Sequence, residues 1–252
     1  MTIVSGFADI SVFQLLLVAL MALFASIIGG LAGYGTGALM PLVLVPLVGA
    51  EPVVPIIAIS AIFTNSSRAL AYLRYADRRR ALIVLACAAL TTALGAYGYT
   101  RLTNAGAALV IGSMLILSVP LRRVLRRLNW RPSPGVQIGA GAGFGFLDGG
   151  MTGTGVILVS MLMSFGVAGS ALIATDAVVS VVLGLAKVAL FGSLASLDAP
   201  LALTGLLVGL CTAPGAFVAR ALLRRIPARV HAGFMEAVVV AGALMLLWHA
   251  RG

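Results

Sequence analysis

Apolar runs of near-spanning length follow one another along almost the whole chain, interrupted only briefly by glycine, proline or charged residues. A helix that crosses the hydrocarbon core, roughly 30 Å thick, needs about 20 mostly apolar residues. We expect ten apolar segments, at about residues 8–33, 36–48, 52–73, 81–102, 105–121, 135–148, 153–166, 168–192, 199–221 and 228–249. The pattern therefore predicts an all-α integral membrane protein.

Two short motifs each occur twice. A Gly-Thr-Gly triplet at residues 35–37 recurs 118 residues later at 153–155, and Thr-Ala-Leu-Gly-Ala-Tyr at 92–97 is matched 120 residues later by Thr-Ala-Pro-Gly-Ala-Phe at 212–217. Nearly equal offsets indicate two related halves of about five hydrophobic segments each. We expect a first membrane repeat over residues 1–127, a basic cytoplasmic linker over 128–134 and a second membrane repeat over 135–252.

The second segment of each half is too short to cross a bilayer upright, because about 13 residues of helix span only roughly 20 Å. We expect each to be a broken or half helix that begins at its Gly-Thr-Gly triplet. The start of such a helix presents unpaired N–H groups and the positive end of its dipole, which suits a small anion. The alternative is that small residues such as Gly29, Gly33 and Gly37 serve close helix packing.

Composition and charge support a membrane protein. Of the 252 residues, 61% are hydrophobic and 10% are charged, whereas soluble domains are about half apolar and about a quarter charged. The net charge of +10 does not indicate nucleic acid binding, because thirteen of the 17 basic residues lie between apolar segments, where the positive-inside rule predicts cytoplasmic loops. These residues are Arg74, Arg78, Arg79, Arg80, Arg122, Arg123, Arg126, Arg127, Arg131, Arg220, Arg224, Arg225 and Arg229.

The basic loops also give the orientation. One precedes the motif at residues 92–97 in the first half, whereas another follows the matching motif at 212–217 in the second half. If these loops face the cytoplasm, the halves are inverted-topology repeats, with five crossings each or three plus a re-entrant loop. We therefore expect a multi-pass protein of the cytoplasmic membrane, with both chain ends outside.

Four ionisable residues within apolar segments are candidates for a functional role, because charge at the centre of a bilayer is costly and usually functional. Asp148 and Asp176 are candidate proton carriers, the alternative being hydrogen-bonded structure. Lys187 and Arg68 are candidates for attracting an anion, the alternative being side chains that extend to the interface, which we favour for Arg68. Polar residues near Asn65 and Thr175 either line a wet cavity or bond neighbouring helices.

Other chemistry is not indicated. Cys87 and Cys211 lie in apolar runs, and neither His231 nor His249 has a second metal-type ligand three or four residues away. The sequence lacks the G-x-x-x-x-G-K-[ST] loop of ATP-driven proteins. We expect no cofactor, no metal and no enzymatic activity.

The glycine segments resemble those of the TauE/SafE family, the sulfite-exporter-type permeases. The first repeat offers Gly30, Gly33, Gly35, Gly37 and Pro41, then Ala58 and Ser60, and the second offers Gly150, Gly153 and Gly155, then Ala174 and Thr175. The segment from Arg225 to Arg229, before the final apolar segment, also resembles that family's closing segment. Thr36 and Thr154 replace the middle glycine of the family's triplet. The resemblance implies a transporter of sulfite, an organosulfonate or a related organic anion, with export as its direction.

The preferred interpretation is a secondary transporter of a small anion that works by alternating access and is coupled to the proton or ion gradient. A passive anion channel is the alternative, and an intramembrane aspartate-dependent enzyme is a remote one. Its expected partners are the anion, a coupling proton or ion and the lipid bilayer, and a homodimer is also considered. The expected anion-binding residues are Gly33, Gly35, Thr36, Gly37, Asn65, Thr152, Gly153, Thr154, Gly155 and Thr175.

Overall fold

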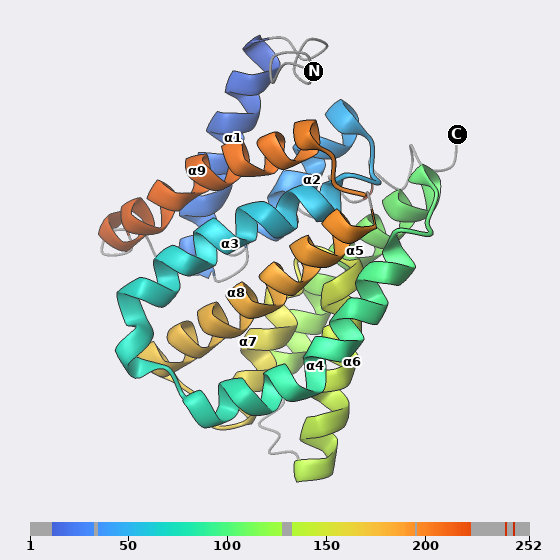
Figure 1. The fold of residues 1–252 in the computed structure, drawn as a ribbon. Helices are drawn as coiled ribbons and strands as arrows, with labels where there is room; N and C mark the ends of the chain where they lie inside the picture. Colours follow the sequence, from blue (N-terminus) through green and yellow to red (C-terminus); the bar gives the residue numbers. More distant parts are fainter. Residues whose placement is uncertain are drawn as a thin grey trace.

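The computed structural model describes residues 12–32, 35–127, 133–194 and 196–222, with two isolated positions at 240 and 244. These residues form helices joined by short connections (Figure 1). The elements are α1 (Val12–Ala32), α2 (Gly35–Val48), α3 (Val53–Tyr72), the 3-10 turn η2 (Leu73–Tyr75), α4 (Arg78–Tyr99), α5 (Asn104–Arg127), α6 (Pro134–Gly150), α7 (Gly155–Ser164), α8 (Gly169–Ser193) and α9 (Ala199–Leu222). The prediction of an all-α protein is confirmed.

Nine of the ten expected segments correspond to these nine α-helices, and the tenth, at 228–249, lies outside the residues described as continuous structure. One boundary was wrong. We expected the chain to leave the membrane segment near residue 121, but α5 continues to Arg127. Apolar residues recur at helical spacing through Leu121 and Val124, arginine is a good helix former, and basic side chains stabilise a helix C-terminus.

Among the residues that the structure describes, the basic residues of the expected loops lie mostly at helix ends, contrary to expectation. Arg78, Arg79 and Arg80 form the first turn of α4, where the Asp77 side chain accepts a hydrogen bond from the Arg80 amide at 3.0 Å and caps the helix. Most of the proposed linker at 128–134 lies outside the described residues, and Pro134 is the first residue of α6.

Three described helices are long and apolar enough to cross a membrane: α3 with η2 (Val53–Tyr75), α4 and α8. Shorter apolar stretches occur in α1, α2, α5, α7 and α9. With 14 and 10 residues, α2 and α7 reach only about 21 Å and 15 Å, less than the roughly 30 Å of hydrocarbon. Large apolar side chains such as Leu70 and Leu90 are exposed on the long helices, as expected where lipid forms the surroundings.

Helix α3 lies between α8 and α9 (Figure 1). It runs antiparallel to α8, since Ile62 meets Gly184 and Arg68 meets Asp176. It runs parallel to α9, since Ile59 meets Gly205 and Thr64 meets Thr212. Glycines let these helices approach closely: a Cβ on Gly205 would lie 2.9 Å from the Cβ of Ile59.

Two further pairs, α4 with α6 and α1 with α9, are packed by small residues. A Cβ on Gly149 would collide with the backbone of Thr92 and Ala96, and one on Gly95 would collide with the carbonyl of Phe146. In the other pair, a Cβ on Gly215 would collide with Ser26, whose hydroxyl donates to the Thr212 carbonyl. Both pairs therefore depend on residues without side chains at the point of crossing.

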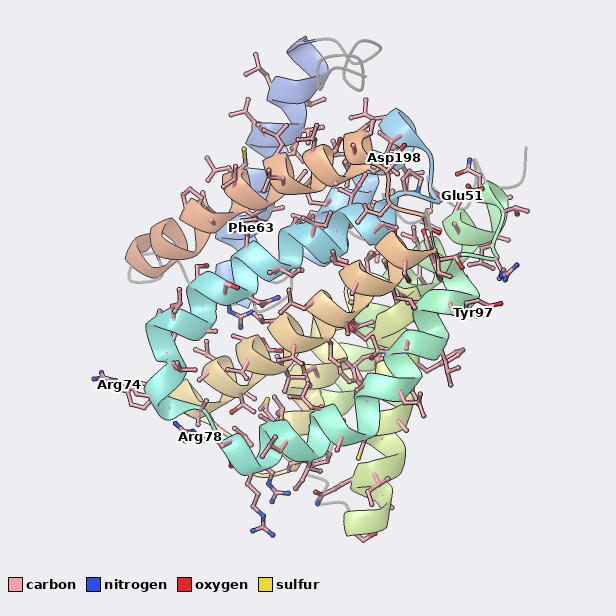
Figure 2. All side chains as sticks on the ribbon, viewed as in Figure 1. Glu51, Phe63, Arg74, Arg78, Tyr97 and Asp198 are labelled. Atoms are coloured by element: carbon pink, nitrogen blue, oxygen red, sulfur yellow. The ribbon has the colours of Figure 1, made fainter. Side chains whose placement is uncertain are left out.

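Charged side chains gather at the two ends of this bundle. Figure 2 shows Arg74 and Arg78 together at one end, where α3 gives way to α4, and Glu51 and Asp198 at the opposite end, where α3 and α9 begin. The long helices run between these ends. The end with Arg74 and Arg78 is therefore a basic end, whereas the other end carries Arg101, after α4, together with the two acidic residues.

Candidate functional site

The second Gly-Thr-Gly triplet lies at a break between two helices. α6 ends at Gly150, Met151 is extended, Gly153 has a φ of +79°, and α7 begins at Gly155. A positive φ of this size favours glycine. The amides of Ile157 and Leu158 donate to the Thr154 carbonyl, at 2.9 Å and 3.2 Å. The amides before them, at Gly155 and Val156, have no acceptor one turn earlier within α7, as at any helix start.

The side chain of Thr154 does not cap α7, although it occupies the N-cap position. Its hydroxyl donates instead to Oδ1 of Asp148 at 2.7 Å. The start of α7 therefore has no side-chain acceptor from its own cap residue. The positive end of a helix dipole attracts anions when it is left in this way.

The first triplet begins a helix as well, because Gly35 is the first residue of α2. Gly33 lies outside the described residues, and the side chain of Thr36 is not described. Gly37 faces the other half of the chain: a Cβ added there would lie 2.8 Å from the nitrogen and 3.1 Å from the Cα of Gly153. The two triplets therefore meet backbone to backbone, and the start of α2 lies beside the break that precedes α7.

Thr152 lies at this contact with an unpaired hydroxyl. Its residue is only 4% exposed, and its Oγ1 has no hydrogen-bond partner within the described part of the chain. The carbonyl carbon of Thr152 lies 3.9 Å from where a Cβ on Gly37 would be. Buried hydroxyls normally find a partner, so an unpaired one beside a helix start calls for a functional explanation.

Lys187 of α8 holds the end of α6. Its Nζ lies 2.9 Å from Oδ2 of Asp148 and donates to the Asp148 carbonyl oxygen at 3.1 Å. Both carboxylate oxygens of Asp148 are thus engaged, one by Thr154 and one by Lys187. This ion pair fixes the geometry of the break, since it ties the last turn of α6 to the cap residue of α7 and to α8.

A second ion pair joins α3 to α8. Nη2 of Arg68 lies 2.8 Å from Oδ2 of Asp176, and Nη1 of Arg68 donates to Oδ1 of Asn65 at 3.1 Å. Asp176 is 2% exposed, and its Oδ1 has no partner among the residues the structure describes. The neighbouring Thr175, also buried, accepts a hydrogen bond from the Asp77 amide at 2.9 Å.

The candidate residues thus fall into two clusters. The triplet contact contains Gly35, Gly37, Thr152, Gly153, Thr154, Gly155, Asp148 and Lys187, and the α3–α8 cluster contains Asn65, Arg68, Thr175 and Asp176. Asp176 and Lys187 are eleven residues apart on α8, which is about three turns, so they share a face and lie roughly 16 Å apart along the axis. α8 connects the two clusters.

The guanidinium of Arg68 is paired with the buried Asp176, a contact that the favoured prediction of a side chain extending to the interface did not include. Lys187 likewise reaches Asp148 on a neighbouring helix and not the end of its own. The attraction of pairing two buried charges explains both orientations, since an unpaired charge in apolar surroundings is strongly unfavourable.

One relation was missed in the sequence, although a signal for it was present. Arg68 and Lys187 are 119 residues apart, between the two motif offsets of 118 and 120. Each half therefore contributes one cation at a matching position. Thr212 was also missed as a contact residue: its hydroxyl accepts from that of Thr64 at 2.8 Å and donates to the Gly209 carbonyl. Its place at the head of the repeated motif was the available signal.

The described helices, with their long apolar stretches and buried ion pairs, are those of a multi-pass membrane protein. A search of the described residues finds no group of three or more histidine, cysteine or acidic side chains placed to hold a metal ion. The chain matches the family model described as Sulfite exporter TauE/SafE over residues 18–246 and therefore belongs to that family of membrane transporters. No curated protein and no solved structure gives a significant match.

Proposed function

We propose that this protein is a secondary transporter that carries a small anion, such as sulfite, an organosulfonate or a related organic anion, across the cytoplasmic membrane. The observation that carries the proposal is the contact of the two Gly-Thr-Gly triplets beside the buried, unpaired hydroxyl of Thr152. Export is the direction that the family name implies.

The anion is bound mainly by backbone in this proposal. The starts of α2 and α7 offer amides and positive dipole ends, and Gly37 and Gly153 let a ligand approach the main chain closely. Thr152 donates its hydroxyl, and the backbones of Gly35, Thr36, Thr154 and Gly155 complete the first site. Asn65 and Thr175 contact the anion further along its path.

The packing supports two inverted-topology repeats, because two contacts between the halves of the chain involve equivalent positions. Gly95 meets Phe146 in the α4–α6 pair, and Gly215 meets Ser26 in the α1–α9 pair. Residues 95 and 215 are 120 positions apart, and so are residues 26 and 146. Exchanging the two halves therefore converts one contact into the other. The corresponding helices α3 and α8 also run in opposite directions. A structure of this kind suits alternating access around a central site.

The charges fit an anion path. Each repeat supplies one cation within a membrane segment, Arg68 and Lys187, and each of them is paired with an aspartate. The basic end with Arg74 and Arg78 faces the cytoplasm in this proposal, following the positive-inside rule. Asp176 or Asp148 couples a proton to transport, because a carboxylate that changes partner can change its protonation.

Thr152→Val tests the site. Valine keeps the shape of threonine and removes the hydroxyl, and because that hydroxyl is unpaired without ligand, we expect thermal stability to stay equal or rise. Uptake of sulfite and methanesulfonate into proteoliposomes should nevertheless fall at least about tenfold, the loss expected for one hydrogen bond to a charged ligand. Thr204→Val is the matched control, since the Thr204 hydroxyl is bonded to the Pro200 carbonyl in its own helix and lies outside the site.

Equal flux in the Thr152→Val and wild-type proteins would exclude this site. Wild-type protein that moves none of the anions would exclude anion transport itself. A channel is distinguished by the same vesicles: a transporter driven by a proton gradient accumulates anion above the external concentration, whereas a channel only equilibrates it along the electrochemical gradient.

A further inference from the structure

The two intramembrane aspartates differ in how their oxygens are used. Both oxygens of Asp148 have partners, Thr154 and Lys187. Asp176 has one oxygen on Arg68, whereas Oδ1 is buried and unpaired within the described part of the chain. A carboxylate normally accepts several hydrogen bonds, so the ionised form of Asp176 is poorly supported at Oδ1. This oxygen is the place at which a proton is best accommodated.

We propose that an anion reaches Arg68 by displacing Asp176, and that Asp176 takes up one proton from solution when this happens. Anion and proton are then bound together, near the α3–α8 contact. This inference rests on the proposed function of anion transport and adds to it the residue that carries the proton and a stoichiometry of one proton for each anion.

Charge balance gives the reason. Arginine stays protonated in proteins, so the positive charge of Arg68 is permanent. With Asp176 ionised, the pair is neutral, and an anion added to it would leave an uncompensated negative charge among apolar helices. With a proton on Asp176, the anion replaces the carboxylate as the partner of Arg68, and the cluster is neutral again.

The geometry allows the exchange. The Arg68 side chain keeps 19% of its surface exposed, whereas that of Asp176 keeps 3%. The Arg68 side chain is therefore the more accessible member of the pair, and Asp176 is the more deeply buried one. Asn65, bonded to Nη1 of Arg68, has an amide that can donate to the same anion.

Within the described residues around Asp176, no other cation is placed to replace Arg68 as the partner of the carboxylate or of the anion. Lys187, on the same helix, is paired with Asp148. From the turn before α4, Asp77 approaches only through the hydrogen bond that its amide donates to Thr175.

The arginines at the basic end have other surroundings. Arg74 stacks on Tyr75, and Arg80 bonds Gln137 and lies over Phe165. Arg78 and Arg79 are exposed. The α7 sequence has no titratable residue, and Tyr72 and Cys87 are the remaining titratable groups of α3 and α4 near this end.

The experiment measures protons and anions together. Purified protein in detergent and weak buffer is titrated with methanesulfonate, which is ionised throughout the working pH range and so carries no proton itself. A pH indicator reports proton uptake, and calorimetry in the same solutions reports binding. We expect about one proton for each anion bound at Arg68 on the alkaline side of the Asp176 titration, and an affinity of this site that falls about tenfold for each pH unit there.

Asp176→Asn mimics the protonated acid, so we expect it to bind methanesulfonate with an affinity that does not change with pH and with no proton uptake. Asp198→Asn is the matched control. Asp198 is exposed at the start of α9, where its Oδ1 accepts from the Leu201 amide, and asparagine caps a helix equally well. This control should keep the wild-type proton uptake.

Wild-type protein that binds methanesulfonate without proton uptake would overturn the inference and leave anion transport standing. The same holds if Asp176→Asn takes up protons as the wild type does. Wild-type protein that binds neither methanesulfonate nor sulfite would overturn the proposed function as well. Because the wild-type titration is decisive alone, a failure of the variant to fold does not protect the inference.

Discussion

Replacing Lys187 by methionine tests the ion pair that holds the helix break. Methionine keeps an unbranched side chain of similar length and removes the charge. Asp148 would then keep the Thr154 hydroxyl but lose the ammonium group from Oδ2 and from its own carbonyl oxygen. A negative charge would remain without a counter-ion at the end of α6.

The magnitude follows from burial. Removing one partner of a buried ion pair costs about 3–5 kcal/mol. The two side chains keep 11% and 12% of their surface exposed, so water can partly solvate the charge that remains, and the low end of the range, about 3 kcal/mol, is expected. In Asp148→Asn/Lys187→Met no charge remains, and the asparagine oxygen still accepts from Thr154. We therefore expect the double variant to be more stable than Lys187→Met by about 1–2 kcal/mol.

The assay is denaturant unfolding in detergent, followed by far-UV circular dichroism, with a double-mutant cycle on the four proteins. Arg101→Met is the matched control, since Arg101 is bonded to Tyr97 on an exposed surface and its loss should cost no more than about 0.5 kcal/mol. If Lys187→Met costs no more than Arg101→Met, or if the two changes at the pair are additive, the pair does not hold the break.

Two further predictions concern the glycine contacts. In α6, Gly149→Ala should prevent close packing on α4 and strongly lower the denaturant concentration at the unfolding midpoint. Gly143→Ala is the control, because a Cβ at Gly143 meets nothing within 4 Å, and this variant should be neutral or more stable by up to about 1 kcal/mol. A denaturant titration of both variants compares them directly. Gly95 and Gly215 occupy contacts that the proposed repeat makes equivalent, so both Gly95→Ala and Gly215→Ala should be destabilising in the same assay. If only one of these two variants had unchanged stability, the result would contradict the proposed equivalence of the two contacts.

The positions of the helices could be predicted from the sequence because apolar runs end where glycine, proline and charge gather. Both short helices begin within two residues of the expected position, at Gly35 and Gly155. The same reasoning failed at the end of α5, because arginines were counted as loop residues although they continue a helical pattern to Arg127. A charge ends the membrane segment, but it does not end the helix.

The partners of the intramembrane charges could not be predicted in the same way. Arg68 and Asp176 are 108 residues apart, and Lys187 and Asp148 are 39 apart. Which cation meets which carboxylate depends on the register of α8 against α3 and α6, and that register is set by glycine contacts such as Gly184 with Ile62. Likewise, the sequence shows Thr152 as one more polar residue, and only the packing shows that its hydroxyl is buried without a partner.

The two ion pairs are mechanically linked because one helix carries a charge of each. Asp176 and Lys187 share a face of α8 and face different helices, α3 and α6, which belong to different halves of the chain. A rigid displacement or rotation of α8 relative to either neighbour therefore changes both pairs at once. Helix α8 also contacts α7, whose start faces Gly37. Because opening one pair alters the restraint on the other and on the helix break, α8 is the element through which a charge exchange at Arg68 would reach the triplet contact.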